Sequence, residues 1–411
     1  MNDYKLIDKC PITKDNKSII YLDLGLMPLV NNLNNTKEES LNCPRYSLAV
    51  QLFEKSGLST LTTEINPNIL YSHYLYKSGV SQPYIEHCEE MFWFMDTYLF
   101  LKEKDKVLDI GGNDGTLLKT FLEKKSFLDV LNIDASTNLT IEAEKNGIPS
   151  INDFWGVELA KKINTKFKLI ITTNCFQHTA PIESFVEGIS MSLEKQGIWC
   201  LEFPYWKTSI ETNQFDQVYH EHIYYYLLKP LTLLLDKYNL NIIKAVKYPI
   251  HGGTMRLLIT HKGKLKETFQ QDEWSVPKIL NQENFTLEDY IKWGENIKKN
   301  IRKSKEYILF LKNKKYKIAG FGAAAKGCVY LNAAEINFNQ IDYVIDDTNI
   351  KQRKFIPGTG IEIVSRKKLQ TNPVDYIIIL AHNFSDYIIK SLRQDNYKGK
   401  FIILLPEIKE I

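Results

Sequence analysis

The chain is organised around the stretch VLDIGGNDGTLL, residues 107–118. Its first four residues form a short apolar run typical of a buried strand, and the glycines that follow permit a tight turn in which backbone closely approaches a ligand. The lysine of a phosphate-cradling GxxxxGK[ST] loop and the spacing of a GxGxxG dinucleotide turn are both missing. An acid at the strand end, Asp109, suits a ligand that carries an ammonium group and ribose hydroxyls, such as S-adenosylmethionine (SAM). We therefore predict a SAM site that includes Asp109, Gly111 and Asn113.

The next two strand signals also end in acids. Leu128 to Ile133 is apolar and is followed by Asp134, at about the spacing from the first acid where α/β nucleotide folds place a carboxylate on ribose hydroxyls. Asp153 and Phe154 follow a third short strand and can offer adenine one hydrogen bond and one aromatic face. The alternative is that Asp134 and Asp153 are helix N-caps or turn residues.

Composition indicates an ordinary globular protein. Of 411 residues, 44% are hydrophobic and 25% are charged, which is typical of a folded chain with two or three domains. A net charge of +3, with cations scattered among acids, argues against a nucleic-acid or membrane partner. No apolar run is long enough for a membrane span and the N-terminus lacks a signal peptide's apolar centre, so we expect a cytoplasmic protein. The six cysteines contain no C-x-x-C pair and read as reduced thiols.

Strand and helix signals alternate from residue 81 to about residue 262. Such alternation predicts a doubly wound α/β sheet with ligands at the carboxyl ends of its strands. Besides the strands already named, the expected strands are Lys168–Thr172, Gly197–Glu202, Asn241–Val246 and Met255–Thr260, and the expected helices are Gln82–Leu101, Glu183–Leu193 and Pro230–Tyr238.

The flanking segments predict three further units. Residues 1–80 are rich in loop-forming residues and read as a small β-containing domain, which ends in an aromatic cluster from Tyr71 to Ser78. Residues 263–314 are charged and helical in pattern and form a connector. Residues 315–411 open with the strand KIAGFG and a glycine-bounded loop, and we expect a second, smaller α/β domain whose final strand is Tyr376–Leu380.

The densest polar cluster is the tetrad Tyr219, His220, Glu221 and His222. A histidine can act as a general base near neutral pH, a glutamate can orient it, and a tyrosine can donate to a developing enolate oxygen. The alternative is a solvated loop with aromatic filler. Three further polar residues stand next to strands at the expected edge of the site: Asn174, His178 and His251. For the two histidines the alternative is a packed residue of the core.

Taken together, the motifs resemble the three-domain deoxysugar C-methyltransferases, which use SAM to methylate nucleotide-linked 4-keto sugars, typically at C-3. The resemblance covers almost the whole chain. The matching motifs, in order, are DLGLMPLVNN (23–32), YLYKSGVS (74–81), DIGGNDGTLL (109–118), NIDASTN (132–138), NxxxH (174–178), YHEH (219–222), HGGTMR (251–256), FGAAAKG (321–327), IDYVIDDTNIKQRKFIPGT (341–359) and LAHNF (380–384).

The resemblance implies a role for each domain and for the matching residues. The first domain would cap the site, the middle domain would bind SAM, and the C-terminal domain would help to hold the nucleotide sugar. His222 would be the base, with Tyr219 and Glu221 as companions and Tyr76 facing the substrate from the first domain. The residues it points to for substrate binding are His178, His251, Lys326 and Asn383.

One departure from the family concerns zinc. Its first domain usually holds a structural zinc with two C-x-x-C pairs, and here those positions read Cys10/Thr13 and Phe53/Ser56. One thiolate of four cannot hold the ion, because structural sites need four ligands. We therefore expect no zinc and a first domain held by packing.

Two rival functions remain open. A sugar O-methyltransferase on the same scaffold would use His222 to deprotonate a hydroxyl, and the motifs do not exclude it. A non-catalytic nucleotide-sugar binding protein with a relict cofactor pocket is the other, although retention of Asp109, Asp134 and the whole tetrad speaks against it. The sequence does not specify the nucleotide base, the sugar, the methylated carbon or the oligomeric state, and nothing in it requires more than a monomer.

Overall fold

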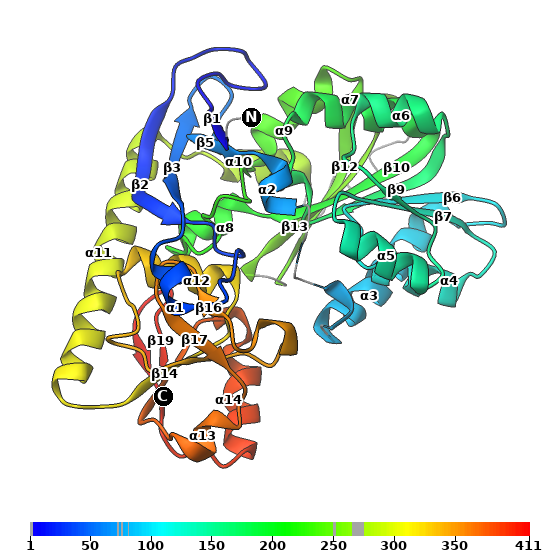
Figure 1. Ribbon diagram of the computed structural model, residues 1–411. Helices are drawn as coiled ribbons and strands as arrows, with labels where there is room; N and C mark the ends of the chain where they lie inside the picture. Colours follow the sequence, from blue (N-terminus) through cyan, green and yellow to red (C-terminus); the bar gives the residue numbers. More distant parts are fainter. Residues whose placement is uncertain (1–2, 72–73, 75–76, 81, 250–251, 265–274) are drawn as a thin grey trace.

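The protein is described by a computed structural model that covers residues 3–71, 74, 77–80, 82–249, 252–264 and 275–411. It has a mixed α/β architecture in which three sheet-containing parts and one long helix are packed together (Figure 1). The expected fold class, a Rossmann-like α/β domain flanked by smaller domains, is confirmed.

The middle domain is built on a seven-stranded sheet with the order β12-β13-β10-β9-β6-β7-β8. β13 is antiparallel to both of its neighbours, and the other pairs are parallel. Since the chain runs from β6 outward to β8 and then returns to β9 on the other side, the strand order reverses between β6 and β9, where such sheets bind ligands. The strands are β6 Lys106–Ile110, β7 Asp129–Asp134, β8 Ser150–Asn152, β9 Phe167–Thr173, β10 Leu193–Pro204, β12 Leu240–Tyr248 and β13 Thr254–His261.

Helices cover both faces of this sheet. One face packs against α3, α4 and α5, and the other against α6, α7 and α9 (Figure 1). In α3 the buried residues recur every three or four positions, which is the stripe that a helix needs to cover a sheet. The helices are α3 Gln82–Leu99, α4 Thr116–Lys124, α5 Thr137–Lys145, α6 Val157–Ile163, α7 Ile182–Ser192, α8 Trp206–Glu211 and α9 Leu228–Asp236.

The N-terminal domain takes one strand from the middle domain. Its four-stranded sheet has the order β11-β4-β3-β2, and β11, Tyr224–Tyr225, is separated from the YHEH tetrad by one residue, Ile223. Tyr224 pairs with Thr60 and Tyr225 with Ser59, so the tetrad loop is anchored between the two domains. The other elements of this domain are β1 Tyr4–Leu6, β2 Ile19–Pro28, α1 Lys37–Leu41, β3 Arg45–Phe53, β4 Leu58–Leu61, β5 Thr63–Ile65 and α2 Pro67–Tyr71.

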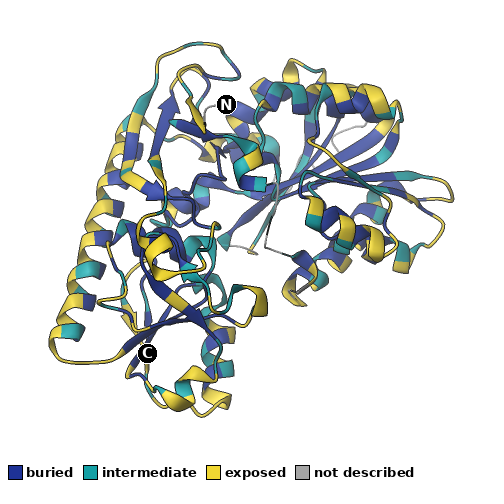
Figure 2. Cartoon of the chain, in the orientation of Figure 1, coloured by how far each residue is buried: buried dark blue, intermediate teal, exposed yellow. Residues whose placement is uncertain are grey.

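The connector contains α10, Val276–Gln282, and the long helix α11, Leu287–Asn313. A capping box starts α11, because the side chains of Thr286 and Asp289 each accept from the other's backbone N–H. The helix runs along β2 and reaches the C-terminal domain (Figure 1). Its buried and exposed residues alternate in stripes, as expected for a helix that covers a core on one side (Figure 2).

The C-terminal domain is a second sheet of the same kind, with the order β16-β17-β15-β14-β18-β19-β20. The prediction that Tyr376–Leu380 forms the final strand is wrong, because β19 and β20 follow it. β19 is a four-residue strand after a charged stretch, too short to stand out from a loop in the sequence. The elements are β14 Ile318–Phe321, α12 Ala325–Ala333, β15 Val344–Ile345, β16 Phe355–Ile356, β17 Ile361–Val364, α13 Lys368–Thr371, β18 Tyr376–Ile379, α14 Ser385–Gln394, β19 Lys400–Ile403 and β20 Lys409–Glu410.

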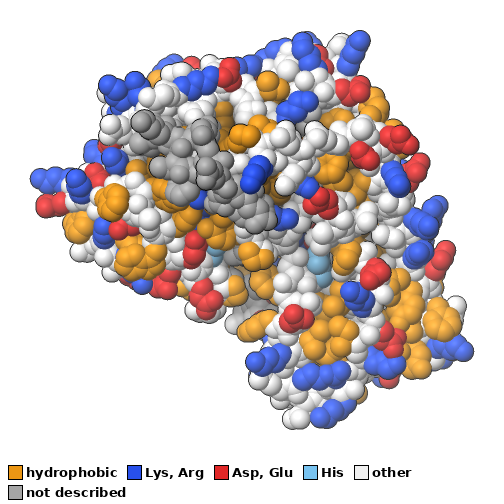
Figure 3. All heavy atoms as spheres, turned by 180° about the vertical axis from the view of Figure 1, so that it is seen from behind, with side chains coloured by type: hydrophobic (Ala, Val, Ile, Leu, Met, Phe, Trp, Pro, Cys, Tyr) orange, Lys and Arg blue, Asp and Glu red, His pale blue; other side chains and the backbone are white. Residues whose placement is uncertain are grey.

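Charges are dispersed over the surface. On the face drawn in Figure 3, Lys and Arg side chains lie among Asp and Glu rather than forming a stripe of one sign. Among the described residues no helix combines the length and the apolar character that crossing a bilayer requires.

The four positions that correspond to the family's zinc ligands lie together in the folded first domain. Cys10 Sγ is 3.2 Å from Ser56 Oγ, and Cys10 Sγ also accepts from the backbone N–H of Thr13 at 3.5 Å. Ser56 Oγ donates to the carbonyl of Phe53 at 3.2 Å. A thiol–hydroxyl contact inside a buried cluster therefore stands where the relatives are expected to have four thiolates.

We expect the purified protein to contain no stoichiometric zinc, because Cys10 is the only cysteine among those four positions. Elemental analysis of protein purified without chelators is the measurement. As a control, adding EDTA should leave the melting temperature unchanged, since a structural metal contributes folding free energy that a chelator removes. About one zinc per chain would contradict this prediction.

Candidate active site

The turn after β6 requires glycine at two successive positions. Gly111 has a φ of +74°, and a Cβ there would lie 2.5 Å from Cys175 Sγ. At Gly112 a Cβ would lie 2.2 Å from Asn132 Oδ1 and 2.6 Å from Asp109 Oδ2. The backbone can follow this path only without side chains, which keeps the turn close to the carboxyl edge of the sheet.

Asp109 is a buried carboxyl group with no described hydrogen-bond partner for either oxygen, and its exposed fraction is 1%. Burial and, to a smaller extent, the nearby charge of Asp134 raise the pKa of Asp109 to about 8. A buried carboxyl group that lacks a partner is costly, and a cationic ligand group would relieve that cost. The side chain therefore fits the ammonium-bearing cofactor that the sequence predicts.

Asp134 and Asn113 bind each other at the same edge. Asp134 Oδ2 accepts from the backbone N–H of Asn113 at 3.0 Å, and Oδ1 accepts from that of Ser136 at 2.8 Å. Asp134 thus has the turn role that we considered as the alternative. Each carboxylate oxygen can accept more than one hydrogen bond, so this role is compatible with contact to ribose hydroxyls.

The remaining cofactor candidates also follow strands at this edge. Asp153 is exposed and accepts from the backbone N–H of Phe154 at 2.8 Å, and the Phe154 ring is 46% exposed after β8. Asn174 follows β9 with a φ of +49°, and its N–H donates to the carbonyl of Glu202. All of these residues lie at or just after the carboxyl ends of strands of one sheet.

We expect Asp134→Ala to weaken SAM binding by roughly 1.5–3 kcal/mol, the cost of losing hydrogen bonds to a charged acceptor. Isothermal titration calorimetry gives the affinity directly. Asp129→Ala is the matched control, because Asp129 is an exposed acid at the opposite end of the same strand. If Asp134→Ala bound SAM as tightly as this control, Asp134 would not contact the ribose.

The tetrad loop is turned rather than extended. The N–H of His222 donates to the carbonyl of Tyr219, and this turn brings the Tyr219 hydroxyl to 2.7 Å from His222 Nε2. His222 Nδ1 lies 2.8 Å from the carbonyl of Gln217. A carbonyl can only accept, so the proton of the neutral ring is on Nδ1, and Nε2 accepts from Tyr219.

His178 packs against this pair. Its ring lies edge-on to the ring of His222, with centroids 4.8 Å apart, and its Nδ1 is 3.0 Å from the Tyr71 hydroxyl. Burial is the main cause that lowers the pKa of His222 well below its ordinary value, with His178 and Lys326 as further causes. Burial also lowers the pKa of His178 to about 4, so both imidazoles are neutral near pH 7.

Glu221 is directed toward the N-terminal domain. Asn31 Nδ2 donates to Glu221 Oε1 at 2.6 Å, and the Tyr74 hydroxyl donates to Oε2 at 3.0 Å. Burial raises the pKa of Glu221 to about 7. Among the described residues His222 is therefore oriented by Tyr219 and Gln217, and not by Glu221 as its adjacency in the sequence suggested.

His220 takes a third direction. It is buried, and its Nε2 lies 3.3 Å from the carbonyl of Tyr46 in the N-terminal domain. Because the loop turns between Tyr219 and His222, neighbouring side chains of the tetrad contact different parts of the structure.

Sequence reasoning missed several residues around the histidines. Tyr71 donates to the backbone carbonyl of Glu221 at 3.2 Å. Tyr74 and Asn31 donate hydrogen bonds to the carboxylate of Glu221. The aromatic cluster from Tyr71 to Ser78 and the motif DLGLMPLVNN contain these residues, so a signal existed, but nothing in the chain order showed that they meet Glu221. Farther along the same stretch, the N–H of Ser78 donates to Asn113 Oδ1 at 3.1 Å.

The remaining substrate candidates come from the C-terminal domain and the HGG turn. Lys326 Nζ lies 3.3 Å from Asp216 Oδ2. Asn383 packs close to Gly252, where an added Cβ would be 3.1 Å from its Oδ1. Tyr76 and His251 lie outside the described residues.

Comparisons with known proteins agree with this arrangement. Residues 88–245 match a methyltransferase domain model, and residues 249–406 match the C-methyltransferase C-terminal domain model. The chain is 26% identical over 421 residues to C-methyltransferase NovU of Streptomyces niveus, covering 98% of this chain and 97% of that protein.

Solved structures match less than half of the chain. A SAM-dependent methyltransferase from Clostridium acetobutylicum is 16% identical, with a TM-score of 0.35, and the match covers 44% of this chain and 92% of that one. The magnesium protoporphyrin IX methyltransferase of Synechocystis with bound SAM is 12% identical, with a TM-score of 0.33 and coverage of 43% and 79%. From the two family models and the near full-length relative, the chain is a SAM-dependent methyltransferase of the C-methyltransferase family.

Proposed function

We propose that this enzyme methylates a carbon of a nucleotide-linked 4-keto sugar, at C-3, through an enolate formed by His222. The observation that carries the proposal is the buried pair of Tyr219 and His222, in which a neutral imidazole presents Nε2 to a phenol. The resemblance of the motifs to deoxysugar C-methyltransferases supports the substrate class. The name of the relative, C-methyltransferase, supports carbon as the acceptor.

Carbon methylation needs a carbanion, and an adjacent ketone provides it by taking the charge as an enolate. SAM, when bound, supplies an electrophilic methyl group. The protein must therefore remove one proton beside the ketone and stabilise the oxygen that becomes negative.

The Tyr219–His222 pair can do both. In the structure the phenol O–H donates a hydrogen bond to Nε2, which orients the imidazole, and burial keeps the imidazole neutral. When a ketone binds, rotation of the phenol toward the forming enolate oxygen uncovers Nε2 for the proton of the neighbouring carbon. One hydroxyl thus holds the base before the reaction and stabilises charge during it.

The other assigned residues complete the proposal. Asp109, Gly111, Asn113 and Asp134, with Asp153, Phe154 and Asn174 farther along the same edge, hold the cofactor. The residues proposed to meet the nucleotide sugar can form hydrogen bonds or ion pairs with its hydroxyls and phosphates: Tyr76, His178, His251, Lys326 and Asn383.

Deuterium wash-in tests the reaction type. In D₂O without SAM, the enzyme should exchange the proton beside the ketone of a 4-keto nucleotide sugar, because enolate formation precedes methyl transfer. An O-methyltransferase would leave that position unlabelled and would yield a methyl ether by mass spectrometry. A binding protein without activity would bind the sugar in calorimetry but produce neither exchange nor methylated product.

The pH dependence of kcat/KM should have its acid limb below pH 6.5. The base must be neutral to accept a proton, and burial lowers the pKa of His222 from its ordinary 6.5, so activity is lost only as pH falls through the lowered value. A pH–rate profile on the free enzyme measures this limb. An acid limb above pH 7 would contradict His222 as the base.

A further inference from the structure

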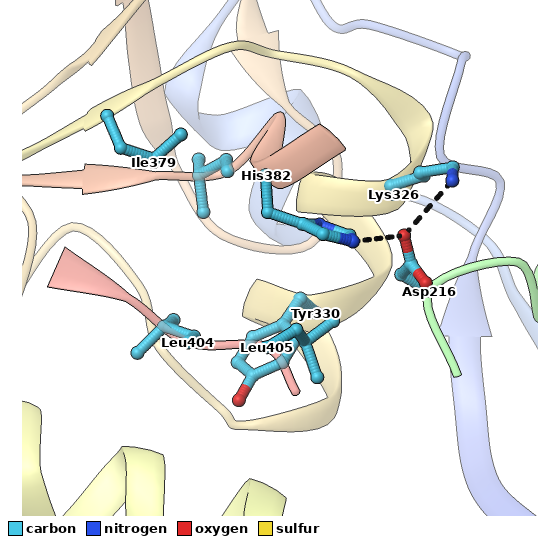
Figure 4. Close-up of a pocket in the computed structure, with 8 residues that line it drawn as sticks. Asp216, Lys326, Tyr330, Ile379, His382, Leu404 and Leu405 are labelled. Atoms are coloured by element: carbon cyan, nitrogen blue, oxygen red, sulfur yellow. Dashed lines mark ion pairs between the residues drawn. The ribbon is translucent and has the colours of Figure 1, made fainter. Parts of the chain in front are cut away.

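The loop that carries His222 is also held by the C-terminal domain. This loop, Phe215 to Ile223, is called the base loop below. Asp216 in it has an exposed fraction of 1%, and its Oδ2 lies 3.3 Å from both Lys326 Nζ and His382 Nε2 (Figure 4). Neither carboxylate oxygen has a described hydrogen-bond partner, and Lys326 supplies its nearest described positive charge. Burial lowers the pKa of His382, so that ring faces the carboxylate as a neutral group near pH 7.

These two groups stand at the point where the strand order of the C-terminal sheet reverses. β14 and β18 are neighbours there, Lys326 lies in the first turn of α12 after β14, and His382 follows β18. Open α/β sheets bind their ligands in that crevice. In this chain a carboxylate from the middle domain points into it (Figure 4).

The surroundings make this contact sensitive to loss of either partner. The same pocket is lined by Tyr330, Leu404 and Leu405, so the carboxylate and the ammonium meet beside apolar walls. Charges attract more strongly there than at the surface, and without Lys326 the buried Asp216 carboxylate would lose its nearest described counter-charge.

Asp216 is directly connected to the base. The next residue is Gln217, whose carbonyl accepts the Nδ1 proton of His222. We propose that Asp216 is a positioning residue for methyl transfer: the C-terminal domain holds the base loop by this carboxylate and thereby places His222 against the substrate. The inference rests on the proposed role of His222 as the base.

Several groups face His222 and determine how it responds to a change at Asp216. They are Tyr219 in the same loop, His178 after β9 and Lys326 on α12. On the side of the N-terminal domain, the hydroxyls of Tyr71 and Tyr74 bind the adjacent residue, Glu221. Lys326 lowers the pKa of His222, and Asp216 lies against that ammonium. Removing the carboxylate charge should therefore lower the pKa of His222 further.

Asp216→Asn tests the proposal, because it keeps the shape of the side chain and removes its charge. We expect kcat to fall by at least about tenfold, toward the ~10²-fold that a misplacement of about 1 Å can cost. SAM affinity should stay unchanged, because the cofactor edge lies on another sheet. The acid limb of the pH–rate profile should move to lower pH, a readout that a purely structural role would not shift.

Glu335→Gln is the matched control. Glu335 forms an exposed ion pair with Lys305 near the end of α12, and its loss should change neither kcat nor the pH limb. If Asp216→Asn does not fold, His382→Gln carries the test: kcat should fall at unchanged SAM affinity, and the acid limb should stay in place because Asp216 and Lys326 keep their charges. Wild-type kcat and an unshifted limb in the folded variant would overturn the inference.

The test separates this inference from the proposed function. If His222→Ala is inactive while Asp216→Asn behaves as wild type, the base assignment stands and the positioning role fails. If His222→Ala retains activity, the proposed function fails, and with it the role of Asp216.

Discussion

Replacing His222 with Ala or Asn should lower kcat by about 10²–10⁴-fold, the loss expected for a positioned general base, while SAM binding stays nearly intact. The reason is that His222 is the histidine whose Nε2 meets the Tyr219 hydroxyl, while Gln217 fixes its tautomer. The effect corresponds to about 3–5 kcal/mol of transition-state stabilisation. Single-turnover kinetics with a 4-keto nucleotide sugar, alongside calorimetry with SAM, measure the two quantities separately.

His220→Ala is the internal control, because His220 shares the loop but contacts Tyr46 in the N-terminal domain. Since that ring is buried, the substitution should cost stability, and kcat of the folded protein should stay within a few-fold of wild type. If His220→Ala abolished activity while His222→Ala kept most of it, the base assignment would be wrong, although a C-methyltransferase reaction would remain compatible.

Gly294→Ala should destabilise the protein by about 3 kcal/mol or more, the upper range for overpacking a core. Gly294 lies within α11 against β2, and a Cβ there would be 1.9 Å from the carbonyl oxygen of Tyr21. Because the obstacle is backbone, a rotamer change cannot relieve it. Alanine ordinarily stabilises a helix interior relative to glycine by about 1 kcal/mol. A loss of stability on Gly294→Ala would therefore indicate the close contact with β2.

Urea denaturation measures this difference in the free energy of unfolding. Glu295→Ala is the control, because Glu295 is the next residue on α11 and is exposed, so its substitution should change stability by less than about 0.5 kcal/mol. A Gly294→Ala variant as stable as wild type would mean that α11 does not pack on β2 as closely as described.

Much of the fold could be predicted because its signals are local. A strand such as β6 is a short apolar run ended by glycines, and α3 shows its buried stripe at helical spacing. The residues proposed to bind the cofactor lie at the ends of consecutive strands. Because a parallel sheet brings the ends of its strands to one edge, chain order alone predicts that Asp109 and Asp134 lie near each other. The sequence did not predict β19, because a pattern of only four residues does not distinguish a strand from a loop.

The relations among the tetrad residues were decided by tertiary structure. The sequence determined that Tyr219, His220, Glu221 and His222 are adjacent, and adjacency suggested that Glu221 orients His222. The loop instead turns on itself and is packed between three domains, so Glu221 binds Asn31 and Tyr74, and His220 faces Tyr46.

The same reason explains why the partners of Asp216 could not be read from the sequence. Lys326 and His382 lie more than a hundred positions away in the chain, and the contact forms only because the C-terminal sheet presents its crevice to the base loop. The sequence by itself determined the two α/β sheets, the sheet edge to which the predicted cofactor residues belong, and the residue types available for chemistry. Which of those residues meet was decided by the packing of domains, because long-range contacts depend on how separate elements dock and leave no periodic pattern in the chain.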